Sequence, residues 1–98
     1  MSERVEGARR VISLTGELDM AGAPALEARV GELCADAPEV LVIDLSGLTF
    51  IDSTGLRTLL SAQSMCDAQA CDLSLVQGPE NVQRLFALTG LLDHLPFQ

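Results

Sequence analysis

The side chains best placed for chemistry in this chain are two adjacent hydroxyls, Ser53 and Thr54, which follow the carboxylate of Asp52. Gly55 comes next, and a helical pattern of apolar residues begins at Leu56. A helix N-terminus presents unpaired backbone N–H groups and a partial positive charge, and both stabilise a phosphate. The segment therefore favours a regulatory phosphate on one of these hydroxyls over catalysis.

The same residues also have a purely structural interpretation. Asp, Ser and Thr are common at helix N-termini, where each side-chain cap contributes about 1 kcal/mol. Ser53 is the natural N-cap candidate, with Thr54 next, and Gly55 lets another protein approach closely. A phosphate here would add about −1.5 to −2 charges within reach of Asp52 and Asp44, and would repel an acidic partner.

Two catalytic readings of this segment lack the residues that they need. A nucleophilic Ser53 requires a base, but the only histidine is His94, and the surrounding sequence is not a G-x-S-x-G elbow. In a phospho-aspartate receiver, Asp44 would accept the phosphate at the end of a strand, and that chemistry is expected to need a lysine. The chain has no lysine. We therefore expect no enzyme activity, no catalytic residues and no cofactor.

The hydropathy pattern predicts alternating strands and helices. Residues 11–18 alternate between apolar and polar, which is typical of a half-buried strand, and residues 4–8 suggest a short strand that turns at Gly7. A helix is predicted from Pro24 until Pro38 stops it. The apolar run of residues 40–45 then indicates a central strand covered on both faces.

The second half of the chain repeats this alternation. A helix from Leu56 is predicted to end within residues 66–70, followed by a strand over residues 73–76. A third helix opens at Gly78-Pro79 and ends near Gly90, and the apolar tail of residues 91–97 is expected to cover the sheet. The order predicts a single α/β domain with a mainly parallel sheet and with functional loops at the carboxyl ends of its strands, the 44–55 loop among them.

Composition narrows the classes of partner. The formal net charge is −8, and six arginines supply all the basic charge, so we expect no direct contact with nucleic acid or anionic lipid. No apolar run approaches the roughly 20 residues that span a bilayer, and the first ten residues carry no signal sequence. These features predict a cytoplasmic protein with no membrane span.

The cysteines Cys34, Cys66 and Cys71 are expected to be free, reduced thiols. The spacing of Cys66 and Cys71 does not suit zinc, so no metal site is predicted. Nothing in the sequence assigns these cysteines a function.

Three segments resemble one family. DLSGLTFIDSTGL at residues 44–56 resembles the signature of STAS domains, specifically of bacterial anti-sigma-factor antagonists. GELDMAGAPAL at residues 16–26 and LSLVQGPENVQRLFALTGL at residues 73–91 are similar to flanking segments of that family. The resemblance implies a single STAS-like α/β domain over residues 1–98. Its mixed, mainly parallel sheet would have four to five strands packed with about four helices.

The resemblance also implies a function, that of an anti-sigma-factor antagonist, or anti-anti-sigma factor. In that family the unphosphorylated protein binds an anti-sigma factor that is also a serine kinase, and thereby releases the sigma factor. Phosphorylation of the position that matches Ser53 ends the binding, and a serine phosphatase restores it. Thr54 is a less favoured acceptor. The domain is expected to be a monomer or weak dimer. The implied partner surface consists of Asp19, Asp44, Asp52, Ser53, Thr54, Gly55 and Leu56.

The sequence departs from the family pattern in two places. Residues 66–75 read CDAQACDLSL, without the usual glycines and basic residues, and Gly22 stands where Thr or Ala is more usual. The first departure bears on the partner's identity and on local surface charge. The second could loosen the start of the first helix.

Other interpretations stay open within the same fold. Some STAS domains are subunits of lipid-transporting ABC transporters and bind the ATPase without a phosphorylation cycle, and others are ligand-binding or sensor modules. The D-S-T-G segment, with Ser first, favours the regulated branch. Asp19 also has a simpler role as a helix cap, Asp44 as an acceptor for loop N–H groups, and Leu56 as a core residue.

Overall fold

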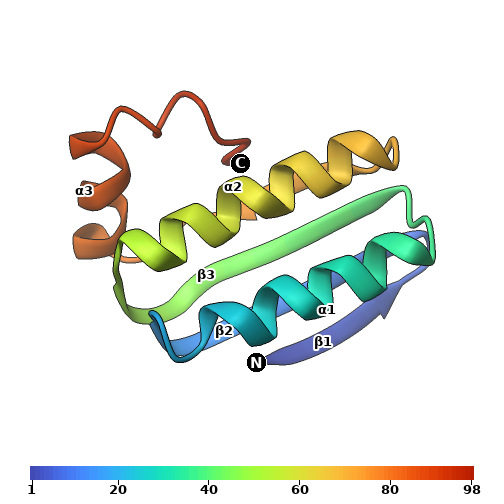
Figure 1. The fold of residues 1–98 in the computed structure, drawn as a ribbon, viewed down its shortest axis with the longest axis horizontal. Coiled ribbons are helices and arrows are strands. Elements are labelled where there is room, and N and C mark those ends of the chain that lie inside the picture. The colour runs from blue at the N-terminus through green and yellow to red at the C-terminus, as the bar shows by residue number, and fades with distance from the viewer.

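A computed structural model describes all residues, 1–98, as one α/β domain (Figure 1). The elements in chain order are β1 (Ser2–Glu6), β2 (Arg9–Leu18), α1 (Ala23–Ala35), β3 (Val40–Ile51), α2 (Ser53–Ala68), β4 (Asp72–Val76) and α3 (Glu80–Leu88).

The four strands form one sheet in the order β1-β2-β3-β4. β3 pairs in parallel with both of its neighbours, whereas β1 and β2 form an antiparallel hairpin that turns at Gly7, where φ is +65°. The sheet is therefore better described as mixed than as mainly parallel. The structure has three helices rather than about four, because the tail after α3 forms turns instead of a helix.

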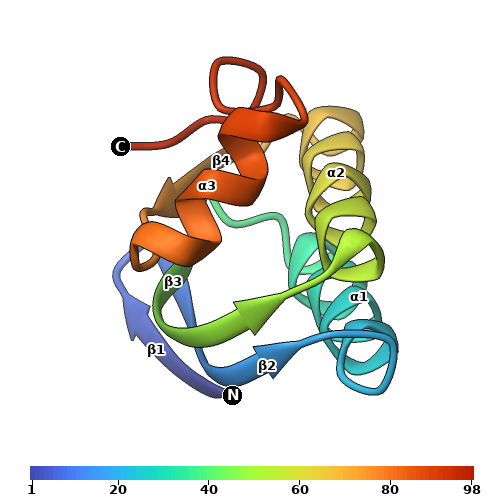
Figure 2. The ribbon, with the colours of Figure 1, turned by 90° about the vertical axis from the view of Figure 1, so that its left-hand side faces the viewer.

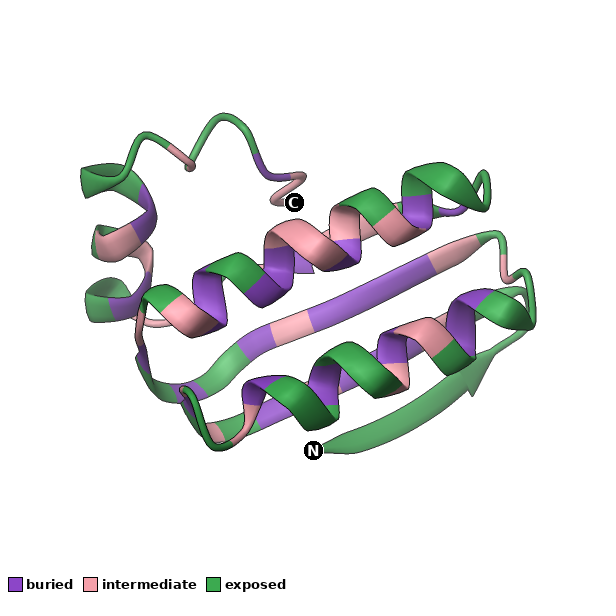
Figure 3. Ribbon diagram, viewed as in Figure 1, coloured by how far each residue is buried: buried purple, intermediate pink, exposed green.

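Helices α1 and α2 lie side by side on one face of the sheet, and α3 lies across its end (Figures 1 and 2). Buried and exposed stripes alternate along both long helices, whereas every residue of β1 is exposed (Figure 3). The central strand was predicted to be covered on both faces. The long helices cover one face, and Val42, which points to the other, is buried as well. None of the helices is long and apolar enough to cross a membrane.

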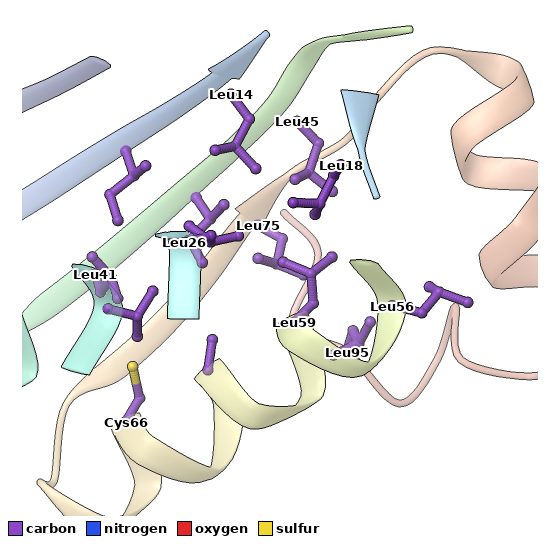
Figure 4. Packing of buried hydrophobic residues seen from close by; sticks show 14 of the residues in the cluster. Leu14, Leu18, Leu26, Leu41, Leu45, Leu56, Leu59, Cys66, Leu75 and Leu95 are labelled. Carbon is purple, nitrogen blue, oxygen red and sulfur yellow. The ribbon is translucent and has the colours of Figure 1, made fainter. Parts of the chain in front are cut away.

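The core is mainly aliphatic, includes the buried ring of Phe86, and lies between the sheet and the helices (Figure 4). Leu41, Ile43 and Leu45 of β3 point into it, as period-two alternation requires, and are fully buried. Leu59 of α2 packs in the same cluster. The predicted cover by the tail is confirmed by Leu95, which is buried in this core.

β3 continues well beyond the predicted end of its apolar run. Gly47 pairs with Thr15 of β2, and a Cβ at Gly47 would lie 2.7 Å from the carbonyl oxygen of Leu14. The Ser46-Gly47 pair is thus a strand segment in close contact with β2, not a loop. The pairing of β2 with β3 shifts register twice, between Ser13 and Thr15 and again between Gly16 and Glu17.

Candidate functional site

The carboxyl ends of β2 and β3 meet at one corner of the domain, and both long helices start there (Figures 1 and 2). Leu18 and Ile51 are paired across the two strands. The backbone N–H of Asp52 donates to the carbonyl oxygen of Leu18 at 3.3 Å. Asn81 of α3 braces this end of the sheet by donating to the carbonyl of Thr49 at 2.9 Å. The site is therefore anchored by three elements that are distant in sequence.

Asp52, not Ser53, is the N-cap of α2. Its backbone is extended, with φ −115°, and its Oδ1 accepts a hydrogen bond of 3.0 Å from the N–H of Gly55. Its carbonyl oxygen accepts from the N–H of Leu56 at 3.0 Å. Asp52 is also tied to Leu18 by a sheet hydrogen bond, and with the cap at Asp52 the helix begins at Ser53, one residue earlier than a cap at Ser53 would allow.

This arrangement leaves the Ser53 hydroxyl free. Ser53 is the first residue of α2, it is exposed, and its side chain makes no hydrogen bond within the protein. Asp52 already satisfies the first-turn N–H group that a serine cap would have satisfied. The hydroxyl is thus accessible to an enzyme and is not needed to hold the helix.

Thr54 lies differently from its neighbour. It is partly buried and lines a shallow groove of about 250 Å³ between the first turns of α1 and α2, together with Glu27 and Arg57. Its carbonyl oxygen accepts from the buried hydroxyl of Thr58 at 3.1 Å. Of the two adjacent hydroxyls, Ser53 is therefore the more accessible.

Gly55 and Leu56 lie beneath the surface. Gly55 is buried, and a Cβ there would meet the carbonyl oxygen of Leu18 and lie 2.8 Å from Cγ1 of Ile51. Its lack of a side chain serves the packing of α2 against the sheet, rather than the approach of a partner that the sequence suggested. Leu56 is only 5% exposed and belongs to the core.

The two remaining predicted aspartates lie apart from each other. Asp19 belongs to the corner, where its Oδ1 accepts from the N–H groups of Ala21 at 3.0 Å and Gly22 at 3.2 Å. Gly22 is the N-cap of α1, and this helix has no side-chain cap, because the two N–H groups that Asp19 binds lie before its first turn. Asp19 therefore orders the loop that leads into α1 and is not the helix cap considered for it.

Asp44 lies well before the end of β3. Its register partners are Ser13 and Val76, and its Oδ1 accepts from the N–H of Ser46 at 2.9 Å. Because Ile43 and Leu45 on either side point into the core, Asp44 points to the opposite face of the sheet. The structure does not bring Asp44 to the corner that holds Ser53.

The corner contains two exposed apolar side chains that sequence reasoning did not single out. Met20, in the loop between β2 and α1, is 75% exposed, and Phe50, opposite Glu17 near the end of β3, is 48% exposed. The sequence groups Phe50 with Ile51 as an apolar pair, but only Ile51 is buried. Strict alternation along a strand would have separated them.

Arg57 was also not singled out from the sequence. It is exposed on the second turn of α2, four residues after Ser53. Arg57 has no carboxylate within ion-pair distance, whereas each of the other five arginines has one: the pairs are Arg4–Glu6, Arg9–Glu6, Arg10–Asp36, Arg29–Glu3, Arg29–Glu32 and Arg84–Glu80. The spacing from Ser53 was visible in the sequence, but the missing partner was not.

The cysteines lie away from this corner, in the layer between the helices and the sheet. Cys34 of α1 and Cys66 of α2 are buried with their Sγ atoms 3.8 Å apart, and Cys71 is buried nearby. Burial raises the pKa of the Cys66 and Cys71 thiols, so both are protonated at neutral pH. These side chains are packing residues in the structure.

We compared the chain with families and proteins that are already known. The STAS domain profile matches residues 1–98. The anti-sigma-F factor antagonist RsfB of Mycobacterium tuberculosis is 41% identical over 81 residues, which make up 83% of this chain but slightly under two thirds, 66%, of RsfB. The anti-sigma-B factor antagonist of Bacillus subtilis is 33% identical over 82 residues, covering 84% of this chain and 74% of that protein.

A solved structure agrees with these matches. The crystal structure of an anti-sigma factor antagonist from Mycobacterium paratuberculosis superposes with a TM-score of 0.86 at 34% identity, over 98% of this chain and 81% of that one. Fold, sequence profile and relatives thus agree over nearly the whole chain. The protein belongs to the STAS domain family, within its group of anti-sigma factor antagonists.

Proposed function

We propose that this protein is the anti-sigma-factor antagonist of a partner-switching cascade. In its unphosphorylated form it binds an anti-sigma factor that is also a serine kinase, and so releases the sigma factor. Phosphorylation of Ser53 ends the binding, and a serine phosphatase restores it. The protein acts in the cytoplasm as a non-enzymatic switch, as a monomer or weak dimer.

The observation that carries this proposal is the free hydroxyl of Ser53. It is exposed at the first position of α2, while the neighbouring carboxylate of Asp52 performs the capping. A kinase can therefore modify Ser53 without breaking a hydrogen bond of the native fold. Thr54, which lines the groove between the helices, is the poorer acceptor.

The partner surface that we propose surrounds this hydroxyl. Met20 and Phe50 supply exposed apolar area at the same corner, and Asp19 and Asp52 supply carboxylates that are already fixed by backbone hydrogen bonds. Preorganised side chains lose little entropy on binding. Gly55 and Leu56 shape this surface from below, and Asp44 lies outside it.

Phosphorylation would change the electrostatics of this surface without unfolding it. The helix N-terminus stabilises the phosphate, so the fold tolerates the modification. The dianion must nevertheless be desolvated whenever a partner covers the corner, and it lies beside fixed carboxylates. Binding therefore weakens while the domain stays folded.

Intact-mass spectrometry tests the proposal directly. The protein is incubated with ATP and each anti-sigma kinase encoded in its own genome, with Ser53→Ala and Thr54→Ala as matched variants. We expect one added phosphate on the parent and on Thr54→Ala, and none on Ser53→Ala. If no kinase adds a phosphate, and a transporter ATPase is captured stably instead, the protein is the STAS subunit of a lipid-transporting ABC transporter.

A further inference from the structure

Arg57 is the single arginine without an ion pair in a chain whose formal net charge is −8. Fourteen acidic residues are available, yet none lies within ion-pair distance of it. Even Glu27, which lines the same groove on the side of α1, makes no such contact. An unpaired cation is unusual on this surface, and it lies one helical turn from the proposed phosphoacceptor.

The helix geometry directs Arg57 toward Ser53. Residues four apart on an α-helix lie on the same face, with their Cβ atoms roughly 5–6 Å apart. Helical side chains also lean toward the N-terminus of their helix, so an arginine at the second position of such a pair extends over the first. Both residues are exposed, and no other side chain bonds to the Ser53 hydroxyl.

We propose that Arg57 is the resident counter-ion of phosphorylated Ser53. Its guanidinium presents a planar fork of N–H donors, which matches two oxygens of a phosphate. The inference rests on the proposed phosphorylation of Ser53 and adds a positioning residue to it. In the unmodified protein Arg57 is a free cation beside the partner surface. In the phosphorylated protein its guanidinium is paired with the phosphate on Ser53.

One modification then makes two electrostatic changes at the corner. The phosphate adds negative charge at Ser53, and it also withdraws the only unpaired arginine from solvent and from any acidic group of a partner. The pairing also holds the phosphate along α2 instead of leaving it mobile. An aspartate at position 53 is shorter and carries one charge, so it reproduces only part of this change.

The test uses phosphoserine incorporated genetically at position 53 of the full chain, so that no kinase is needed. Phosphorus NMR follows the titration of the phosphate in the parent, in Arg57→Gln and in Arg84→Gln. The last variant removes the same charge from an exposed site on α3, where Arg84 pairs with Glu80 at 3.4 Å. All three keep the buried contacts of the fold.

A nearby guanidinium favours the dianion, so the titration midpoint lies at lower pH when Arg57 is present. We expect the midpoint to rise by about 0.3 pH unit in Arg57→Gln, the equivalent of one exposed i,i+4 ion pair. Arg57→Lys should recover part of the shift, and Arg84→Gln should leave the midpoint unchanged. Equal midpoints in the parent and Arg57→Gln would overturn the proposal.

This outcome is separable from that of the proposed function. If no kinase modifies Ser53 but the two midpoints differ, the partner-switching assignment fails and the pairing of Arg57 with a phosphate at this position stands. If a kinase modifies Ser53 and the midpoints coincide, the switch stands and Arg57 has no part in holding its phosphate.

Discussion

Gly55 lies so close to the backbone carbonyl of Leu18 that no side chain fits between them. The contact joins the first turn of α2 to the end of β2, the two elements that set the position of Ser53. The Leu18 carbonyl belongs to the backbone, so it cannot move aside for a new side chain as the end of a flexible side chain can. The phosphoacceptor is thus positioned by a backbone-to-backbone contact.

Gly55→Ala should therefore destabilise the domain by about 1–3 kcal/mol, the usual effect of forcing a methyl group into a packed site. Gly31→Ala in α1 is the matched control, since a Cβ there meets only Sδ of Met65 at 3.8 Å. That variant should gain up to about 1 kcal/mol from higher helix propensity. Urea unfolding of both variants measures the difference, and equal midpoints would contradict the packing argument.

Asp52→Ala should lower the free energy of unfolding by roughly 0.5–2 kcal/mol, because it removes the acceptor for the Gly55 N–H. Ser53→Ala should change it by less than about 0.5 kcal/mol, as the serine hydroxyl makes no hydrogen bond. Thermal unfolding at pH 7 compares the two. The opposite ranking would mean that Ser53 is the cap, as its sequence position alone suggested.

The edge strand β1 is tied to α1 by an ion pair between Glu3 and Arg29, with Nη2 to Oε1 at 2.7 Å. Hydrogen bonding from Arg29 lowers the pKa of Glu3 below its usual range. The pair therefore stabilises the fold at pH values above the usual carboxyl pKa, and the stabilisation is lost as the pH falls through the lowered pKa. Both side chains are about one-third exposed, so screening keeps the effect small.

Glu3→Gln should accordingly cost roughly 0.2–1 kcal/mol at pH 7. The difference in free energy of unfolding between Glu3→Gln and the parent should decrease steadily in urea titrations taken toward pH 3. It should also decrease in 1 M salt. Glu80→Gln, at the more exposed pair with Arg84, is the control and should show almost no deficit at any pH. A constant deficit for Glu3→Gln across the pH series would point to packing rather than charge.

Substitutions at Ser53 distinguish the binding of the partner from its control by phosphorylation. Ser53→Ala should bind the anti-sigma factor as the parent does and remain bound in the presence of kinase and ATP. Ser53→Asp should bind about tenfold more weakly or worse, a loss of ~1.4 kcal/mol or more, because a carboxylate must be desolvated next to Asp52. Calorimetric titration measures both. Tight binding by Ser53→Asp, with an unchanged fold, would speak against an electrostatic switch.

The positions of the helices were predictable because their apolar periodicity is local. The sequence places α1, α2 and α3 correctly to within a few residues, and it places the hydroxyls at the start of α2. The cap was misassigned because Asp and Ser are both good N-caps. The deciding interaction is the hydrogen bond of Asp52 to Leu18, which no local pattern reveals.

The length of β3 was underestimated for a similar reason. Ser46 and Gly47 are typical turn residues, but the pairing of Gly47 with Thr15 and of Leu48 with Gly16 holds this segment in the sheet. Long-range pairing outweighs local preference here. The placement of Asp44 was wrong as a consequence, because a site thought to end the strand lies within it.

The two register shifts between β2 and β3 have a consequence for how this fold can vary. Arg9 pairs with Val40, but Leu18 pairs with Ile51, so β3 takes up two more residues than β2 over the same span. One surplus residue of β3 lies opposite the step from Ser13 to Thr15, and the other lies beside Gly16, which adopts a φ of +79°. The two shifts therefore determine where α2 starts relative to the β2–α1 loop. Removing one β3 residue would turn the following side chains to the other face of the sheet, so changes of length here would alter the corner itself rather than merely shorten a strand.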